Sequence, residues 1–172
     1  MERVDEVLVA LRRIIRATDL HSKQLAKNTG LTAPQMLLLQ TLRNKGEETV
    51  GELAKEMNLS QATVTTILDR LEKKSLIVRE RATNDRRKVM VYLSDSALDI
   101  LKDAPIPLQE QFTRQFNDLQ DWEQLMIITS LGRIAHMMDA QHIDASPVLD
   151  VGTLDRQYLS LIHISEPTRR TQ

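Results

Sequence analysis

The spacing of apolar positions predicts helices over the first part of the chain. Residues 4–26 keep apolar side chains in the i, i+3, i+4 rhythm of one long helix, and Gly30 is suited to end it because glycine tolerates a left-handed backbone. A second helix is expected between Thr32 and Gly46, with Thr32 and Gln35 forming a capping box. Apolar residues cover nearly its whole circumference, which indicates a central position in the core.

Two shorter helices follow, joined by a tight turn. Thr49 and Glu52 form a second capping box that opens the first of them. Ser60 can cap the next helix, expected over residues 60–76, because its side-chain oxygen can accept a backbone N–H. One stripe of that helix is apolar at helical spacing, namely Val64, Ile67, Leu68 and Leu71. Two short helices with such a turn predict a helix-turn-helix.

The period of the pattern changes after Leu76. Residues 77–81 are expected to be extended, and residues 83–85 to form a turn. Val89, Val91 and Leu93 then alternate with other side chains, as in a half-buried strand. A helix-turn-helix followed by a basic-tipped β-hairpin predicts a winged helix, and this order is more specific than any one of its parts.

Helices are expected again in the last third. Ser94 can cap a helix that carries Ala97, Leu98 and Leu101, until Pro105 and Pro107 break it because proline lacks a backbone donor. Helix resumes through residues 108–119. Asp121, with Gln124 three residues on, is expected to open a last helix over 122–141. Apolar residues cover more than one face of this helix, which favours a dimer interface over deep burial within one chain.

Composition removes several kinds of site. The 172 residues contain no cysteine, which excludes disulfides, thiol redox sensing and thiolate metal ligands. His136 and His142 are six apart and do not share a helical face, so neither a metal site nor a cofactor is expected. No apolar run approaches the roughly 20 residues of a membrane span, and no signal peptide opens the chain. A cytoplasmic protein is therefore expected.

The net charge of −1 conceals an uneven distribution. Residues 60–93 hold eight Lys or Arg and four Asp or Glu, whereas the remaining residues hold 15 cations and 20 anions. A basic segment on an acidic body indicates a local contact with a polyanion. The helix over 60–76 has the matching chemistry, because short polar side chains near its start suit base edges and cations further along suit phosphates. An ordinary amphipathic surface helix is the alternative for that helix taken alone.

Two stretches resemble the MarR family of bacterial transcriptional regulators, and the resemblance extends over about residues 1–142. They are ELAKEMNLSQATVTTILDRLEKKSLI (52–77) and the wing RERATNDRRKVMVYLS (79–94). The Asp-x-Arg of the wing tip, here Asp85 and Arg87, is the most distinctive short pattern. The resemblance implies an obligate homodimer, a recognition helix in the major groove and a wing arginine in the minor groove.

The resemblance also implies which residues touch DNA. On the recognition helix they are Ser60, Gln61, Thr63, Thr65, Thr66 and Arg70. Either Arg86 or Arg87 would enter the minor groove, with Asp85 orienting Arg87. His21 would lie in the cleft between the dimer and DNA-binding lobes, as an effector-binding residue, although an exposed surface histidine is the alternative. Ser75 departs from the family, which usually has glycine there, and would cost roughly 1 kcal/mol if its backbone is left-handed.

The expected fold class is mainly α with a small β-hairpin wing (α+β), a winged helix-turn-helix with N- and C-terminal dimerisation helices. The expected division is a dimerisation helix at 1–28, the DNA-binding domain at 29–94, dimerisation helices at 95–143 and an extended tail at 144–158. Residues 159–172, LSLIHISEPTRRTQ, resemble a translated sequencing adaptor and are excluded from fold reasoning. Residues 7–35 resemble the family branch that regulates osmoprotectant (ectoine or betaine) synthesis genes.

The function favoured by these patterns is that of a dimeric DNA-binding transcriptional regulator. We expect a repressor on a pseudo-palindromic operator, modulated by a small-molecule effector or solute. A winged-helix adaptor that binds a protein and no DNA is the alternative, disfavoured because an adaptor needs no cationic recognition helix and wing. An enzyme is not expected, since the sequence has no Gly-rich phosphate loop after a strand, no nucleophile elbow and no marked carboxylate pair.

Overall fold

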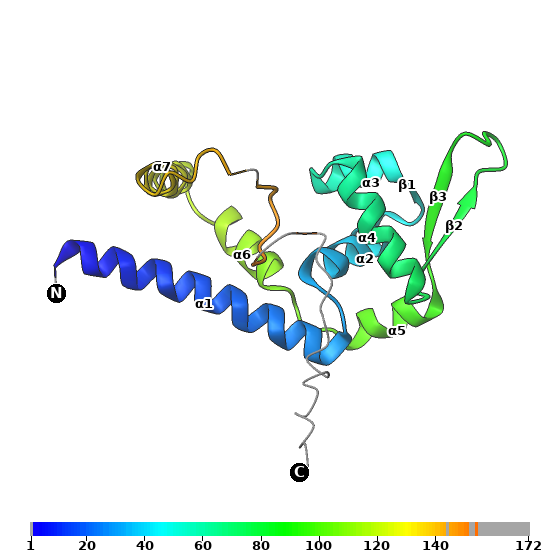
Figure 1. Ribbon diagram of the computed structural model, residues 1–172, viewed down its shortest axis with the longest axis horizontal. Helices are drawn as coiled ribbons and strands as arrows, with labels where there is room; N and C mark the ends of the chain where they lie inside the picture. Colours follow the sequence, from blue (N-terminus) through cyan, green and yellow to red (C-terminus); the bar gives the residue numbers. More distant parts are fainter. Residues whose placement is uncertain (1, 144, 152–153, 155–172) are drawn as a thin grey trace, which may run out of the picture.

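The computed structural model describes residues 2–143, 145–151 and 154. The elements in chain order are α1 (Arg3–Thr29), α2 (Ala33–Lys45), β1 (Glu48–Thr49), α3 (Val50–Met57), α4 (Gln61–Lys73), β2 (Ile77–Arg81), β3 (Val89–Leu93), α5 (Asp95–Asp103), α6 (Leu108–Asn117) and α7 (Asp121–Met137). Figure 1 shows a lobe built from α2–α5 and the sheet, from which the β2–β3 hairpin projects, while α1 extends away on the opposite side, where α6 and α7 also lie. The predicted fold, mainly helical with a small β wing, is confirmed.

The wing belongs to a three-stranded antiparallel sheet in the order β1-β3-β2. β2 pairs with β3 from Ile77 opposite Leu93 to Arg81 opposite Val89. β1 pairs with the other edge of β3, with Glu48 opposite Val91. The sequence pattern did not predict β1, because two residues are too few to show a strand's alternation. This short strand anchors the base of the hairpin to the start of α3.

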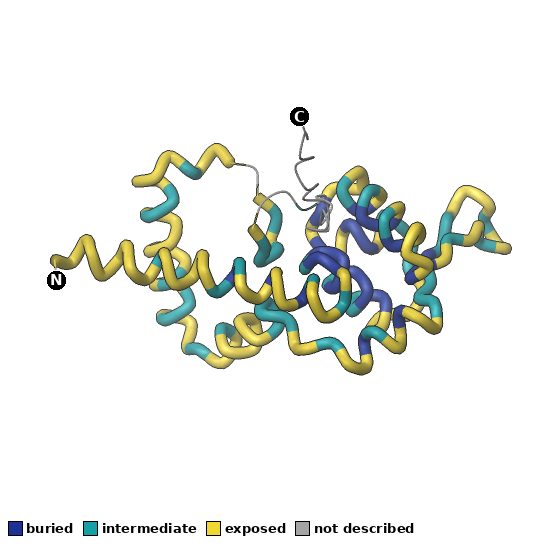
Figure 2. The backbone as a smooth tube through the Cα atoms, turned by 60° about the horizontal axis from the view of Figure 1, so that its bottom comes forward, coloured by how far each residue is buried: buried dark blue, intermediate teal, exposed yellow. Residues whose placement is uncertain are grey.

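The core lies inside the winged lobe, where the dark blue segments gather in Figure 2. α2 contributes Leu38 and Leu39, both wholly buried, and is the central helix that its apolar circumference predicted. The stripe on α4 predicted to be buried is confirmed. On α5 the pattern was only partly correct, because Ala97 and Leu101 are buried whereas Leu98 is 39% exposed.

Most helix ends follow the predicted capping residues. Gly30 ends α1 in the left-handed region, at φ 71°. The capping boxes that begin at Thr32 and Thr49 are both present, and Ser60 and Ser94 each accept a backbone N–H from the third residue after them. Pro105 and Pro107 separate α5 from α6, as proline chemistry requires.

The limits of two helices differ from the prediction. α4 ends at Lys73 rather than at residue 76, because Ser75 turns into the left-handed region at φ 58°. α7 is capped by Gln120 with Glu123, not by Asp121 with Gln124. The Gln124 amide instead donates to the Phe116 carbonyl in the last turn of α6 and to the Leu119 carbonyl just after it. α7 also stops at Met137 rather than at residue 141.

The outer helices bury little of their surface within one chain. None of the residues of α7, all of which the structure describes, is buried, and α1 buries Thr18, Ser22 and Leu25 alone. In Figure 2 the first half of α1 is almost entirely exposed. Across the described part of the chain, no helix is long and apolar enough to cross a membrane.

The predicted extended tail is described only in part. Residues 145–151 and Leu154 carry no helix or strand, and Val148 and Leu154 pack against the core cluster. Residues 159–172, which resemble a translated adaptor, lie outside the described residues.

Candidate functional site

The helix-turn-helix is formed by α3, a tight turn and α4. Asn58 adopts the left-handed conformation at φ 51°, which asparagine tolerates better than most residues. The Leu59 amide donates to the Ala54 carbonyl at 2.9 Å, and the Ser60 hydroxyl then accepts the Thr63 amide at 3.1 Å. Because α4 buries its apolar stripe against α2 and α3, its other face is fixed toward solvent.

That outward face carries the residues predicted to read DNA. Gln61 and Thr65 are exposed, while Thr63, Thr66 and Arg70 are half-buried. Within the described residues, Gln61, Thr65 and Arg70 make no side-chain hydrogen bond or ion pair. Their donors and acceptors are therefore available to a ligand laid along the helix.

The hydroxyl groups on the same face are partly engaged by the helix itself. The Ser60 and Thr63 hydroxyls lie 2.8 Å apart, and the Thr66 hydroxyl donates to the Ala62 carbonyl at 3.0 Å. These bonds fix the side-chain rotamers and leave acceptor lone pairs on the oxygens. The Thr66 hydroxyl is thus left as an acceptor, one of the Ser60 and Thr63 hydroxyls keeps its O–H as a donor, and Gln61 can offer both donors and acceptors.

Arg79 on β2 is held by two carboxylates of α4. Its guanidinium pairs with Asp69 at 2.7 Å and also with Glu72. The hydrogen bond from Arg79 lowers the pKa of Glu72, and the same contact raises the pKa of Arg79. This three-residue ion cluster ties the wing to the recognition helix. Arg79 therefore serves the structure and is not one of the cations free to contact a polyanion, although the net charge of residues 60–93 is unchanged because its two acid partners were counted as well.

Lys74, at the end of α4, is a second cation with a structural role. Its ammonium group donates to the Gly30 carbonyl at the end of α1. Burial lowers the pKa of Lys74. The end of the recognition helix is thereby joined to the end of the long first helix, a connection that the sequence pattern did not predict.

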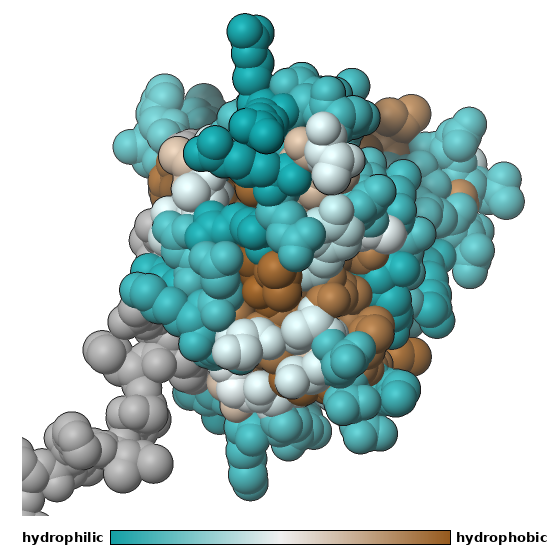
Figure 3. Space-filling model, turned by 90° about the vertical axis from the view of Figure 1, so that its right-hand side faces the viewer, coloured by the Kyte–Doolittle hydropathy of each residue, from teal (hydrophilic) through white to brown (hydrophobic). Residues whose placement is uncertain are grey.

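The wing tip is a turn organised by Asp85. Its carboxylate accepts the Arg87 backbone amide at 3.0 Å, and its carbonyl accepts the Lys88 amide at 2.9 Å. Asp85 thus orients Arg87 through the main chain, and no ion pair between the two side chains is formed. Arg86, Arg87 and Lys88 are exposed on the projecting tip. Seen from the wing side, the surface is mostly hydrophilic, with apolar residues gathered near the middle of the face (Figure 3).

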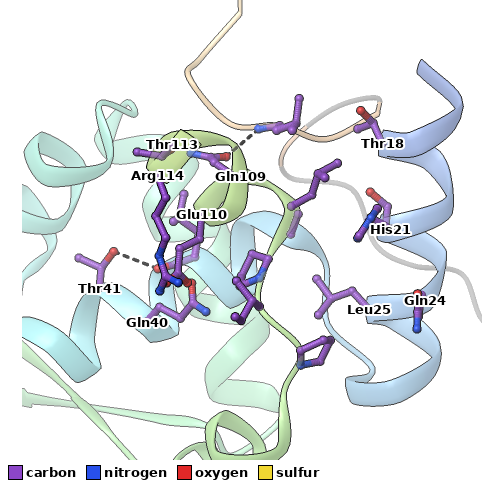
Figure 4. A pocket seen from close by; sticks show the side chains of 18 of the residues that line it. Thr18, His21, Gln24, Leu25, Gln40, Thr41, Gln109, Glu110, Thr113 and Arg114 are labelled. Atoms are coloured by element: carbon purple, nitrogen blue, oxygen red, sulfur yellow. Dashed lines mark hydrogen bonds and ion pairs between the residues drawn. The ribbon is translucent and has the colours of Figure 1, made fainter. Parts of the chain in front are cut away.

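A separate pocket of about 560 Å³ lies between α1, α2 and α6. Its walls include Thr18 and Leu25 of α1, Thr41 of α2 and Thr113 of α6 (Figure 4). His21, the residue predicted from the family resemblance to face an effector, lines this pocket from α1. The structure thus locates His21 beside a cavity, on a solvent-exposed part of α1.

The pocket mixes apolar walls with amide, hydroxyl and charged groups. Gln40 and Gln109 contribute amides, while Arg114 forms an ion pair with Glu110 one helical turn earlier. None of these was singled out from the sequence, because α1, α2 and α6 are far apart along the chain and no periodicity links them. The break at Pro105 and Pro107 was the one local signal that the chain turns back toward α1 there.

Residues 31–89 match the family model described as "MarR family". The chain is 29% identical over 138 residues to the uncharacterised HTH-type transcriptional regulator YsmB of Bacillus subtilis, covering 80% of this chain and 94% of YsmB. It is 30% identical over 130 residues to a second B. subtilis regulator of this type, YcgE, covering 76% of this chain and 84% of YcgE.

Among solved structures, the chain is similar to BpsR of Bordetella bronchiseptica. The identity is 27%, the TM-score is 0.53, and the match covers 78% of this chain and 96% of BpsR. The BpsR structure concerns regulation of its DNA binding by 6-hydroxynicotinic acid. The likeness extends beyond the winged lobe, since it covers nearly the whole of that protein.

Proposed function

Because this chain belongs to the MarR family of DNA-binding transcriptional regulators, we propose that it acts as a homodimeric repressor. In this proposal it binds a pseudo-palindromic operator, and a small molecule bound in the pocket between α1, α2 and α6 changes its affinity for that DNA. The observation that carries the proposal is the open polar face of α4, with Gln61, Thr65 and Arg70 outward, beside a wing tip with three exposed cations.

The two basic elements have different tasks in reading DNA. α4 presents short hydrogen-bonding side chains, which suit base edges in the major groove, where a good contact discriminates by about 1–3 kcal/mol. The wing presents Arg86 and Arg87 on a hydrogen-bonded turn, which suits the narrow minor groove and its negative potential. Two-fold symmetry would place the two recognition helices about 34–36 Å apart, one turn of DNA.

Dimerisation is proposed through the outer helices, the segments 1–28 and 95–143, with residues 29–94 as the DNA-binding domain. α7 exposes Trp122 by 64% and Leu125 by 63%, and α1 exposes Leu8 by 57%. Exposed apolar residues gathered on a helix are the kind of surface that marks a protein–protein interface. A second copy of the same chain would present a matching patch, as a two-fold interface requires.

The effector site is proposed on the size and chemistry of the pocket. A volume of about 560 Å³ falls within the range of roughly 300–1,000 Å³ usual for small-molecule sites. BpsR, to which the chain is similar, has its DNA binding regulated by 6-hydroxynicotinic acid. By analogy His21 would contact the effector. The resemblance of residues 7–35 to regulators of osmoprotectant genes stays a hypothesis, which the comparisons do not support.

Binding titrations with operator DNA and a scrambled duplex, at several salt concentrations, test the proposal. Arg87→Ala should weaken binding to both duplexes and flatten the salt dependence, whereas Gln61→Ala or Thr65→Ala should erode the preference for operator and keep the salt slope. Lys102→Ala, an exposed cation on α5, is the matched control and should change neither. The DNA upstream of the gene that encodes this chain is the first duplex to test as operator. Equal loss of specificity from wing and helix variants would contradict this division of tasks.

A further inference from the structure

The segment after α7 returns to the pocket and is held there by Gln109 of α6. The Gln109 side-chain amide donates to the Pro147 carbonyl at 3.0 Å, and its oxygen accepts the Leu149 backbone amide at 2.8 Å. One carboxamide therefore satisfies both a carbonyl and an N–H of the same short peptide. Figure 4 shows Gln109 at the edge of the pocket, with the bond drawn toward the tail. Such a two-point clamp recognises peptide backbone rather than side chain.

A second anchor comes from the opposite wall. The Ser22 hydroxyl of α1 donates to the Asp150 carboxylate at 2.8 Å, and Ser22 is only 5% exposed. The same carboxylate oxygen accepts the Val151 amide, which fixes the turn of the tail at that point. Residues 147–150 are thus held from α6 at one end and from α1 at the other. These two helices are the walls that an effector would also have to touch.

The tail fills space as well as making polar bonds. Leu149 is one of the residues that line the pocket, and the neighbouring Val148 packs against the core cluster. Leu149 and Asp150 are half-buried, although the segment belongs to no helix or strand. An apolar side chain at the cavity wall, a clamped backbone and a held carboxylate together are what a bound peptide ligand would supply.

We propose that this pocket is a groove for a short peptide and that residues 147–150 are its built-in ligand. A small molecule that bonds to the side chains of Gln109 or Ser22, which hold the tail, then binds by displacing the tail. This step rests on the proposed function, in which the pocket is the effector site. Its consequence is that the apparent affinity for an effector falls by the fraction of molecules in which the tail is bound. The groove itself recognises a carbonyl and an N–H two residues apart, followed by a carboxylate.

Amide hydrogen exchange of the full chain tests whether the clamp exists. The Leu149 amide should exchange slowly in the wild type, and Gln109→Ala should speed its exchange by about tenfold or more, because both clamp bonds are lost. Gln111→Ala is the matched control, an exposed glutamine on the same helix, and should leave Leu149 unchanged. Rapid exchange of Leu149 in the wild type, or equal exchange in the two variants, would overturn the proposal.

Peptide binding in trans tests whether the groove recognises this ligand. A fluorescent peptide with the sequence of residues 146–151 should bind weakly to the wild type, where the tail competes. The full-length variant Leu149→Ala/Asp150→Ala should bind the peptide at least about tenfold more tightly, and adding Gln109→Ala should reverse that gain. Equal peptide affinity in the wild type and both variants would refute the groove. Neither readout uses DNA, so a chain that fails to bind operator would refute the proposed regulator and leave these two results standing.

Discussion

The winged lobe and the outer helices use the same kinds of apolar residue with opposite results. On α4, Val64 and Leu68 are wholly buried, because α2, α3 and the sheet surround them. On α7, Leu125 and Leu131 are 63% and 48% exposed, because nothing in the described chain covers that helix. The lobe is therefore complete within one chain, and the outer helices are not. Hydrophobicity alone does not distinguish the two regions, since only the neighbours of each helix decide which apolar residues are buried.

The largest effect is expected where a second surface is needed. Leu131→Asp on α7 should abolish the dimer and operator binding together, because it would bury an unpaired carboxylate in the interface at a cost of about 4 kcal/mol. Sedimentation at micromolar concentration measures the dimer, and circular dichroism should show the helices retained.

The exposure of Leu131 gives this prediction its control. In an isolated chain the new charge would meet water, so the winged lobe should keep its fold. A wild type that sediments as a monomer, or a variant that stays dimeric and still binds operator, would show that the outer helices do not need a second chain to cover them.

The next largest effect is a loss of stability when the buried core of the winged lobe is opened. Leu68→Ala on α4 should lower the free energy of unfolding by about 3 kcal/mol, since it opens a cavity at a site with no exposure. Leu98→Ala is the matched control on α5, where the side chain is 39% exposed and the loss should be well under half as large. Urea denaturation measures both. Equal losses would mean that the lobe is not packed as described.

A smaller change in the free energy of unfolding, this time a gain, is expected from a substitution at the end of α4. Ser75→Gly should stabilise the protein by about 1 kcal/mol, because Ser75 occupies the left-handed region at φ 58° and glycine does so without a Cβ penalty. Ser75→Ala keeps the Cβ atom and should bring no gain. Thermal denaturation should show the midpoint of the glycine variant raised by about 2–4 °C. A lower midpoint would mean that the serine side chain supports the turn.

The smallest effect is expected at the ion cluster that joins wing and recognition helix. Arg79 lowers the pKa of Glu72, so the stabilisation is present above the ordinary carboxyl pKa of 4.5 and is lost as the pH falls through the lowered value. The stability difference between wild type and Arg79→Met should therefore be constant near neutral pH and shrink only in acid. Lys102→Met, which breaks a pair exposed on both sides, should show a smaller difference at every pH.

Local signals made much of the fold predictable. The capping boxes at Thr32 and Thr49, the caps at Ser60 and Ser94 and the stop at Gly30 all act within four residues, so sequence spacing reveals them. Errors arose where two local signals competed. Gln120 with Glu123 and Asp121 with Gln124 are both plausible caps for α7. The first pair forms, because the Gln124 side chain is engaged instead with the Phe116 carbonyl of α6.

Contacts between distant parts of the chain were not predictable. Ser22 and Asp150 are 128 residues apart, and Gln109 lies 40 residues before Leu149, so no periodic pattern connects them. Arg79 was counted with the DNA-facing charge because its partners lie on another element. The positions of Gln61, Thr65 and Arg87 on exposed surfaces agree with their expected roles in DNA contact, which stay a prediction. The adaptor without DNA binding is no longer needed as an alternative, since the chain belongs to a family of DNA-binding regulators.

The projecting hairpin also makes the molecule an electric dipole. Its tip holds Arg86, Arg87 and Lys88 far from the lobe's centre, while the rest of the chain carries a surplus of acid (Figure 1). In the field of a DNA duplex such a dipole experiences a torque, so the wing end turns toward the phosphates before any contact forms. The orienting field decays over about 8 Å at physiological salt. We therefore expect the wing to raise the rate of productive encounters, and low salt to increase both the rate and the strength of DNA binding.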